Sequence, residues 1–257
     1  MRITDPKVKL IAKTEIADGF EEYLEEENID WRPDDVSSSE KLAELAGRVC
    51  YKSFSQNGKF ENNNISRVRE GNESYIKNVI ESKHGSIFEH TSCSILINAS
   101  RVVTHELIRH RAGTGFSQES GRYVRVDDIK IYIPDIIKEN EEANEVFEET
   151  VLYLESQLKK LESIYKINDM KDFTTKKLLT SAFRRILPNG LMNDIVVTAN
   201  HRAWRHMIEL RSSVHAEVEI RFIFNLIAEI MKKEFPNIYQ DMSRNDNGEW
   251  VFINSKI

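Results

Sequence analysis

The stretch Cys93-Ser-Ile-Leu-Ile-Asn-Ala-Ser-Arg-Val-Val-Thr-His-Glu-Leu-Ile-Arg-His-Arg111 changes its pattern of apolar residues halfway along, and the change indicates the fold class. From 93 to 97 an apolar residue stands at every second position, which is typical of a β-strand with one buried face. After Ser100 the apolar residues from 103 to 108 follow helical spacing. The stretch therefore predicts a strand that leads directly into a short helix over residues 101–111.

Outward from this stretch, the same two periodicities predict a helix-rich α+β protein. Ser37-Ser-Ser-Glu40 is a capping box, in which a serine and a glutamate three residues later each satisfy a backbone N–H at a helix start. The longest helical pattern runs from Asn140 to about residue 166. We expect a single domain over residues 1–257. Its other expected elements are strands over 8–12 and 129–133, a helix that Asn72 caps and Gly85 ends, helices over 174–187, 200–211 and 215–235, a segment 195–197 that fits either a strand or a helix start, and a polar tail over 236–257.

The composition excludes several classes of protein. The chain has 257 residues, 40% of them hydrophobic, which is enough apolar material for a core of its own. No apolar run approaches the roughly 18 residues that a membrane span needs, and the first residues lack the apolar core of a signal peptide. Two cysteines, Cys50 and Cys93, are too few for a disulfide scaffold. We expect a soluble, cytoplasmic protein that does not bind membranes.

The charge is negative overall but unevenly distributed. A net charge of -6 argues against a dedicated nucleic-acid-binding protein, which usually carries a basic excess. Residues 101–125 nevertheless contain five arginines and two histidines against two glutamates. Such a concentration of cations in an acidic protein favours a site for a small anion, and the alternative is a solvated basic face.

The strongest chemical pattern lies where this basic segment meets a glycine-containing loop. Arg109-His110-Arg111 is followed by Ala112-Gly-Thr-Gly-Phe-Ser-Gln-Glu-Ser-Gly-Arg122-Tyr123. Guanidinium groups bind phosphate oxygens with paired hydrogen bonds, glycines let backbone N–H groups approach an anion, and serine hydroxyls add donors. The residues predict an anion site, with the alternative that Glu106 and Glu119 neutralise the arginines.

Other kinds of catalytic site find little support in the sequence. His105 and His110, like His201 and His206, are five positions apart, about 140° around a helix, whereas metal-binding pairs on helices share one face. The sequence has no HExxH, CxxC, GxSxG, GxxxxGK[ST] or GxGxxG motif. We therefore expect no metal site, no activated cysteine nucleophile, no P-loop and no Rossmann unit.

The Arg-His-Arg motif and the segment Ser120-Gly-Arg-Tyr123 resemble the signature of the flavin-dependent thymidylate synthases. Further segments resemble this family in the same order along the chain, so that the resemblance covers about residues 45–235. These segments are His84-Gly-Ser-Ile-Phe-Glu-His90, Arg184-Arg-Ile-Leu-Pro188, Asn200-His-Arg202 and Leu210-Arg-Ser-Ser-Val-His-Ala216.

Three departures from the family's pattern are visible. The segment between Arg111 and Ser120 is one residue longer than usual, and we place the extra residue in 112–115, where glycine can absorb it. Glu106 stands where the family often has glutamine, and His206 stands where it often has asparagine. Both changes affect positions that the resemblance places near ligands.

The resemblance implies an α+β fold with a central, mainly antiparallel sheet, assembled as a homotetramer with active sites at subunit interfaces. It implies the reductive methylation of dUMP to dTMP without a cysteine nucleophile, with FAD as cofactor, NADPH or NADH as reductant and 5,10-methylenetetrahydrofolate as carbon donor. The flavin site that it implies consists of His84, Ser86, Glu89, Arg109, His110, Arg111, Gln118, Asn200, His201, Arg202 and His206. The dUMP site that it implies consists of Glu106, Leu107, Ile108, Arg109, Gln118, Glu119, Ser120, Gly121, Arg122, Arg184 and the catalytic Arg211.

Two alternatives stay open at this point. A flavin-binding relative with the same fold could have lost synthase activity through the longer loop or through Glu106. A nucleic-acid-binding protein could use residues 101–125 as a basic face, and its affinity would then fall steeply with salt. The net charge of -6 counts against the second alternative.

Overall fold

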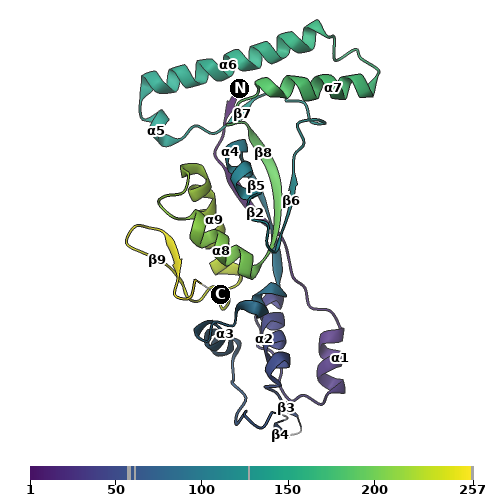
Figure 1. The fold of residues 1–257 in the computed structure, drawn as a ribbon, viewed down its shortest axis with the longest axis vertical. Helices are drawn as coiled ribbons and strands as arrows, with labels where there is room; N and C mark the ends of the chain where they lie inside the picture. Colours follow the sequence, from purple (N-terminus) through teal and green to yellow (C-terminus); the bar gives the residue numbers. More distant parts are fainter. Residues whose placement is uncertain (57–58, 61, 127, 256–257) are drawn as a thin grey trace. The chain divides into compact units, whose positions relative to one another are not determined.

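The computed structural model describes residues 1–56, 59–60, 62–126 and 128–255, and it has the α+β fold that the sequence predicts (Figure 1). Backbone contacts divide the chain into two compact units. Unit 1 comprises Met1–Lys9, Leu96–His110 and Phe116–Val197, and unit 2 comprises Leu10–Ile95, Arg111–Gly115 and Thr198–Ile257. Among the helices of the described residues, none is both long and apolar enough to cross a membrane. The expectation of one domain over 1–257 stays a prediction.

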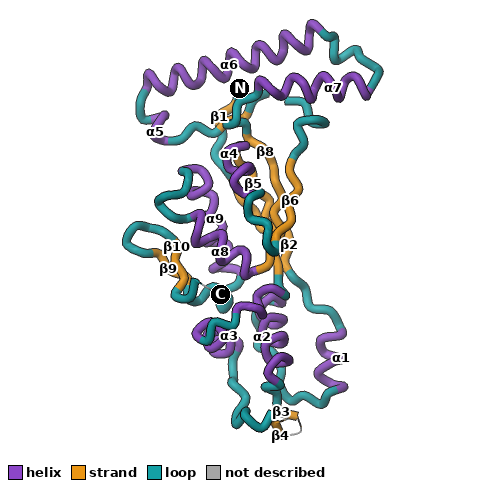
Figure 2. Tube along the Cα trace, in the orientation of Figure 1, coloured by secondary structure: helices purple, strands orange, loops and turns teal. Residues whose placement is uncertain are grey.

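The largest sheet has four strands in the order β2-β5-β8-β6 (Figure 2). The strands are β2 (Lys7–Lys13), β5 (Ser92–Ser100), β8 (Met192–Asn200) and β6 (Thr114–Gln118). Strands β5 and β8 are antiparallel: Ser94 Oγ lies 2.7 Å from Thr198 Oγ1, and Asn98 Nδ2 donates to Asp194 Oδ1 at 2.7 Å. The strand predicted over 93–97 is confirmed, and the undecided segment 195–197 is a strand.

Strands β5 and β8 each lead into a helix without an intervening loop. Ser100 caps α4 (Arg101–Leu107), because its Oγ accepts from Val103 N at 3.4 Å. Asn200 caps α8 (His201–Arg211) in the same way. Helix α4 ends four residues earlier than the predicted 111, because the backbone tightens there and His110 N donates to Leu107 O at 3.0 Å.

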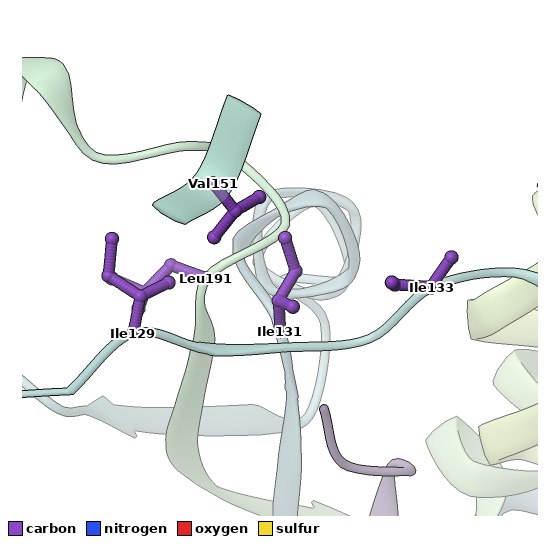
Figure 3. Close-up of a cluster of buried hydrophobic side chains, with 5 residues drawn as sticks. All are labelled: Ile129, Ile131, Ile133, Val151 and Leu191. Carbon is purple, nitrogen blue, oxygen red and sulfur yellow. The ribbon is translucent and has the colours of Figure 1, made fainter. Parts of the chain in front are cut away.

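Unit 1 contains a cluster of buried aliphatic side chains from three segments of the chain, shown in Figure 3. Its members are Ile129, Ile131, Ile133, Val151 and Leu191. The predicted strand over 129–133 shortens to β7 (Lys130–Ile131), which pairs in parallel with β1 (Arg2–Ile3). The predicted alternation is confirmed, since the three isoleucines are at most 1% exposed.

Three helices complete unit 1: α5 (Asp135–Lys138), α6 (Glu141–Ile164) and α7 (Phe173–Phe183). The predicted start of α6 is confirmed, because the Asn140 side chain accepts from Ala143 N at 3.0 Å. Helices α6 and α7 lie side by side (Figure 1) and share a buried cluster of Leu158, Ile167 and Phe183. The predicted helix to 187 instead finishes as a 3-10 turn over Arg184–Ile186, because Pro188 favours an extended Leu187.

Unit 2 holds most of the remaining elements. They are α1 (Gly19–Glu26), α2 (Ser38–Tyr51), α3 (Asn72–Glu81), a 3-10 helix (Gly85–Glu89), α8, α9 (Val218–Glu234), and the hairpins β3 (Ser55–Gln56) with β4 (Lys59–Phe60) and β9 (Met242–Arg244) with β10 (Trp250–Phe252). The capping box of α2 is confirmed, with both reciprocal bonds between Ser37 and Glu40 present. The predicted cap of α3 is wrong: Asn72 is the first helical residue and, being 1% exposed, donates instead to Glu44 Oε2 at 2.7 Å.

The segment after residue 235 carries the β9–β10 hairpin and belongs to unit 2. The predicted polar tail is folded, and several of its apolar side chains are buried: Ile238, Tyr239, Met242, Trp250 and Phe252. Asp241 forms two hydrogen bonds, of 2.7 and 2.9 Å, with the guanidinium of Arg205, which is 1% exposed. A buried arginine needs such a partner, so α8 and this C-terminal segment depend on one another.

Candidate active site

In unit 1 the Arg-His-Arg motif follows α4 on a tight turn. Arg109 is exposed and its N–H donates to Glu106 O at 3.2 Å, while Ile108, the C-cap of α4, is exposed and Leu107 is fully buried. A buried Leu107 side chain leaves only its backbone for a ligand. The turn therefore presents the cationic side chains to solvent while Leu107 anchors it to the core.

The predicted phosphate residues come together on the turn that follows β6. Ser120 O accepts from Tyr123 N and from Val124 N, both at 3.0 Å, and Ser120 Oγ accepts from Arg122 N at 3.4 Å. A Cβ on Gly121 would lie 3.5 Å from Arg184 Cδ, so the Arg184 side chain passes against this glycine. Arg122 and Arg184 are both exposed. The turn and the end of α7 thus form a cationic cluster that suits a phosphate.

Lys177 belongs to this cluster, although the sequence analysis does not single it out. Its Nζ donates to Tyr123 Oη at 2.7 Å and lies 4.3 Å from the centre of the Tyr123 ring. The same hydrogen bond lowers the pKa of the Tyr123 hydroxyl. Lys177 and Arg184 are seven residues apart, two helical turns, and this spacing is the signal that could have identified Lys177.

Gln118 and Glu119 are held by the sheet beside the turn. Gln118 Nε2 donates to Thr104 Oγ1 at 3.0 Å and to Asn193 Oδ1 at 3.4 Å, and Glu119 N donates to Asp194 O at 2.9 Å. Asn193, which is 4% exposed, was not predicted as a site residue. These contacts fix the orientation of Gln118 before any ligand binds.

In unit 2 a cavity of about 280 Å³ collects several of the predicted flavin residues. Its lining includes His84 and Ser86 from the segment around the 3-10 helix, and Arg202 from the first turn of α8. Arg202 forms an ion pair with Glu89. The Tyr51 ring stacks on His84 with 5.5 Å between ring centres, and its hydroxyl lies 3.0 Å from His84 Nδ1. Tyr51, the last residue of α2, was not predicted.

The residues of this cavity fit a phosphorylated aromatic cofactor. Arg202 offers a guanidinium fork, Ser86 a hydroxyl, and the stacked pair of Tyr51 and His84 an aromatic face. Val79 and Ile87 add apolar surface to the same cavity, and Lys83 adds a second cation. This mixture of donors and flat apolar surface is typical of a cofactor site.

The loop after the Arg-His-Arg motif meets the start of α8 within unit 2. Asn200 N donates to Gly113 O at 3.1 Å, and Asn200 Oδ1 accepts from Ala203 N at 2.8 Å. Gly113 has a φ of +66°, and a Cβ there would lie 2.5 Å from Asn200 Nδ2. Only glycine combines a favourable positive φ with the absence of a Cβ that would collide with Asn200. The contact places Arg111, two residues before Gly113, beside the cap of α8.

His201, one of the predicted flavin residues, has its side chain in the core of unit 2. Its side chain is fully buried, its Nδ1 lies 3.0 Å from Tyr239 Oη, and its ring centre is 4.4 Å from that of Phe235. Burial lowers the pKa of His201 to about 3, so the ring is neutral. His201 points into the core while its neighbour Arg202 lines the cavity, because adjacent residues on a helix point about 100° apart.

A second cavity of unit 2, of about 510 Å³, lies at the other end of α8. It brings together the predicted residues His206 and Arg211 with Glu209, Ser213 and His215. Burial raises the pKa of Glu209. In the described residues no three His, Cys, Asp or Glu side chains are grouped so that they could hold a metal ion.

The predicted site residues are divided between the two units. Unit 1 holds Glu106, Leu107, Ile108, Arg109, His110, Gln118, Glu119, Ser120, Gly121, Arg122 and Arg184, and unit 2 holds His84, Ser86, Glu89, Arg111, Asn200, His201, Arg202, His206 and Arg211. An α+β fold with a cationic turn in unit 1 and an aromatic, cationic cavity in unit 2 is typical of proteins that bind phosphorylated ligands.

Comparisons with known proteins identify the family. A family model described as "Thymidylate synthase complementing protein" matches residues 34–237. The flavin-dependent thymidylate synthase of Mycobacteroides abscessus is 36% identical over 242 residues, 91% of this chain and 89% of that one. The flavin-dependent thymidylate synthase of Corynebacterium diphtheriae is 35% identical over 218 residues, 83% of each chain. The chain belongs to the family of flavin-dependent thymidylate synthases, a family of enzymes.

A solved structure shares the fold. A UMP/dUMP methylase, PolB of Streptomyces cacaoi, crystallised with 5-Br dUMP, superimposes with a TM-score of 0.64 at 18% identity, covering 93% of this chain and 96% of that one. The superposition supports a common fold, but an identity this low gives no information about the ligands of this chain. The fold expected from the resemblance is confirmed by this superposition.

The contact between Gly113 and Asn200 generates a first prediction. Gly113→Ala places a Cβ 2.5 Å from Asn200 Nδ2 at a positive φ, so we expect it to lower the free energy of unfolding by about 1–3 kcal/mol. Gly115→Ala is the control, because a Cβ there meets nothing within 4 Å, and we expect a change within about 0.5 kcal/mol. Urea unfolding of both variants measures the difference in stability. Equal stabilities of the two variants would contradict the close contact between Gly113 and Asn200.

The burial of His201 generates a second prediction. The unfolded chain protonates His201 near pH 6.5, whereas the folded protein does so only near pH 3, so His201 makes the free energy of unfolding fall as the pH drops below about 6.5. His201→Gln removes the contribution of His201 to the pH dependence of the free energy of unfolding. The stability advantage of the wild type should therefore shrink from about pH 7 to about pH 5 in urea unfolding.

The same variant tests whether His201 contacts the flavin. With the side chain in the core, His201→Gln should leave the flavin dissociation constant within about threefold of the wild type. A loss of flavin binding by the folded variant would show that His201 contributes to the cofactor site.

Proposed function

We propose that this chain catalyses the reductive methylation of dUMP to dTMP, with 5,10-methylenetetrahydrofolate as the carbon donor, NADPH as the reductant and FAD as the cofactor. The observation that carries the proposal is the grouping of the family's motif residues into a phosphate cluster in unit 1 and an aromatic, cationic cavity in unit 2. Family membership supplies the reaction, and the two groupings supply the residues that would perform it.

The turn after β6 would hold the phosphate of dUMP. Ser120 and Gly121 offer a hydroxyl and an open backbone, Arg122 and Arg184 offer guanidinium forks, and Lys177 adds an ammonium group. The three cations, Arg122, Arg184 and Lys177, would balance the negative charge of one phosphate. Residues that we place beside the nucleotide are Glu106, Leu107 through its backbone, Ile108, Arg109, Gln118 and Glu119.

The cavity around His84 and Arg202 would hold the flavin. Arg202 would bind a flavin phosphate, His84 and Ser86 would line the ring pocket, and Glu89 would orient the Arg202 guanidinium through their ion pair. When bound, the flavin supplies the hydride chemistry, and the protein supplies position and charge. The other proposed flavin contacts are Arg109, His110, Arg111, Gln118, Asn200 and His206.

Arg211 would act on the uracil ring. Its guanidinium cation can stabilise negative charge that develops near N3 and the adjacent carbonyl oxygen. This polarisation activates the ring without a covalent adduct to the enzyme. The proposal agrees with Cys93, whose burial raises the pKa of its thiol to about 12 and keeps it neutral.

Other parts of the proposal rest on the family and on the composition. We place the active enzyme in the cytoplasm as a homotetramer of single-domain chains, with active sites at subunit interfaces. We propose no nucleic-acid partner, in agreement with the net charge of -6. We propose no catalytic metal, since the reaction assigned to this family draws on flavin and folate.

Two adjacent arginines test the phosphate site. Arg184 passes against Gly121, whereas Arg185 turns back along α7 and donates to Ser181 O at 3.0 Å. We expect Arg184→Ala to raise the KM for dUMP by about tenfold or more, because a guanidinium–phosphate pair is lost. Arg185→Ala, the matched control, should stay within about twofold. Steady-state kinetics at varied dUMP measure both, and equal effects would remove Arg184 from the site.

Arg211→Ala tests the proposed reaction. Formation of dTMP from dUMP, methylenetetrahydrofolate and NADPH should fall by about a hundredfold or more, while the flavin content of the purified protein stays that of the wild type. Turnover like that of the wild type would remove Arg211 from the mechanism. A wild-type protein that binds flavin but shows no affinity for dUMP would contradict the function and support a relative without synthase activity.

A further inference from the structure

The β9–β10 hairpin lies beyond residue 237, where the match to the family model ends, yet it contacts the segment directly after Arg211. Helix α8 ends at Arg211, and residues 212–217 connect it to α9 without regular secondary structure. A connection of this kind is mobile unless other groups hold its backbone. Groups that hold this connection therefore act directly next to Arg211, the last residue of α8.

Three consecutive residues of this connection bond to the hairpin. Ser212, which is 1% exposed, accepts from Trp250 N at 3.0 Å and donates to Trp250 O at 3.3 Å through its hydroxyl. Ser213 Oγ donates to Glu249 Oε1 at 3.0 Å, and Val214 N donates to the same oxygen at 2.8 Å. Two adjacent hairpin residues, Glu249 and Trp250, thus hold the three residues that follow Arg211.

The Glu249 carboxylate is itself fixed by the hairpin turn. Asn245 Nδ2 donates to Glu249 Oε2 at 2.7 Å, and Glu249 N donates to Asn245 Oδ1 at 3.0 Å. The hydrogen bonds from Asn245, Val214 and Ser213, in this order, lower the pKa of Glu249 to about 2. The carboxylate is therefore ionised at neutral pH, and hydrogen bonds to an ionised acceptor are stronger than those between neutral groups.

The connection that follows Arg211 also lines the cavity that contains Arg211. Ser213, His215 and Ala216 line this cavity of about 510 Å³ together with His206 and Arg211. Ser213 is thus both a wall of the cavity and a ligand of Glu249. A shift of the connection would change the shape of the cavity around the Arg211 guanidinium.

We propose that Glu249 is a positioning residue for Arg211, and that the β9–β10 hairpin braces residues 212–214 so that the Arg211 guanidinium keeps its place in the cavity. The inference rests on the proposed function in one respect, namely that Arg211 acts on the substrate. The brace itself rests only on contacts within unit 2.

Hydrogen exchange tests the brace independently of catalysis. In Glu249→Ala, the amide of Val214 loses its acceptor, so peptides that cover 212–216 should exchange at least about tenfold faster than in the wild type. Glu229→Ala is the matched control, because Glu229 pairs with Arg244 of the same hairpin at 3.1 Å and has no bond to residues 212–214. Unchanged exchange of 212–216 in Glu249→Ala overturns the proposal.

A double-mutant comparison tests the connection to Arg211. Glu249→Ala should lower kcat for dTMP formation by about tenfold, since small misplacements of a catalytic group are costly, while Glu229→Ala stays within about twofold. In an Arg211→Lys background, Glu249→Ala should change kcat by less than about twofold, because the group that it positions is already gone. Independent, multiplicative losses would show a merely structural role and overturn the proposal.

A graded variant keeps the proposal testable if Glu249→Ala does not fold. Glu249→Gln retains one oxygen that can accept from Ser213 and Val214 but presents an amide to Asn245, so both exchange and kcat should be intermediate. Wild-type values for Glu249→Gln in both measurements would overturn the role of the carboxylate. A wild-type protein that forms no dTMP contradicts the proposed function, whereas the exchange comparison still decides whether the brace exists.

Discussion

The pairing of two antiparallel strands that each become a helix without a loop is the constraint on which the rest of the site depends. Strands β5 and β8 end at Ser100 and Asn200, and the side chain of each residue caps the helix that follows. The ladder continues into the caps, because Arg101 N donates to Leu191 O and His201 N donates to Thr91 O, both at 3.0 Å. The register of the two strands therefore fixes where α4 and α8 begin, and with them every functional side chain that these helices carry.

Arginines serve two purposes in this protein, and burial separates them. Arg48 is fully buried, bonded to Glu44, and lies 4.8 Å from the Trp31 ring, while Arg205 is paired with Asp241. Removing one partner of such a pair leaves a buried charge, so these arginines hold unit 2 together. The arginines that we assign to ligands are instead exposed or half-exposed, namely Arg109, Arg111, Arg122, Arg184, Arg202 and Arg211.

Much of the fold could be predicted because its signals are local. The capping box at Ser37, the start of α6 at Asn140 and the alternation over 129–133 depend on residues within a few positions of each other. In the phosphate cluster, Ser120, Gly121 and Arg122 were predicted as an anion site from their local chemistry, whereas Arg184 was predicted only through the family resemblance, since no local rule brings it to Gly121. Spacing along the chain carries no information about that contact.

Other features of the structure depend on contacts between distant residues, which the sequence does not show. His201 stands inside a basic motif, but its direction is set by Tyr239 and Phe235, far along the chain. The segment after 235 has a polar composition, and only the partners Arg205 and Ser212 show why it folds. The bonds of Glu249 to residues 213 and 214 have the same origin. Such contacts become visible only when the structure is known.

The most direct test of this account is the visible absorption spectrum of the purified protein, recorded anaerobically on addition of NADPH with and without dUMP. The account predicts a flavin spectrum that bleaches at a rate sensitive to dUMP, because the proposed reaction methylates dUMP with reducing electrons that pass through the flavin. A colourless protein that FAD cannot reconstitute would contradict the account, and the cationic turn after β6 would then be a site for a different anion.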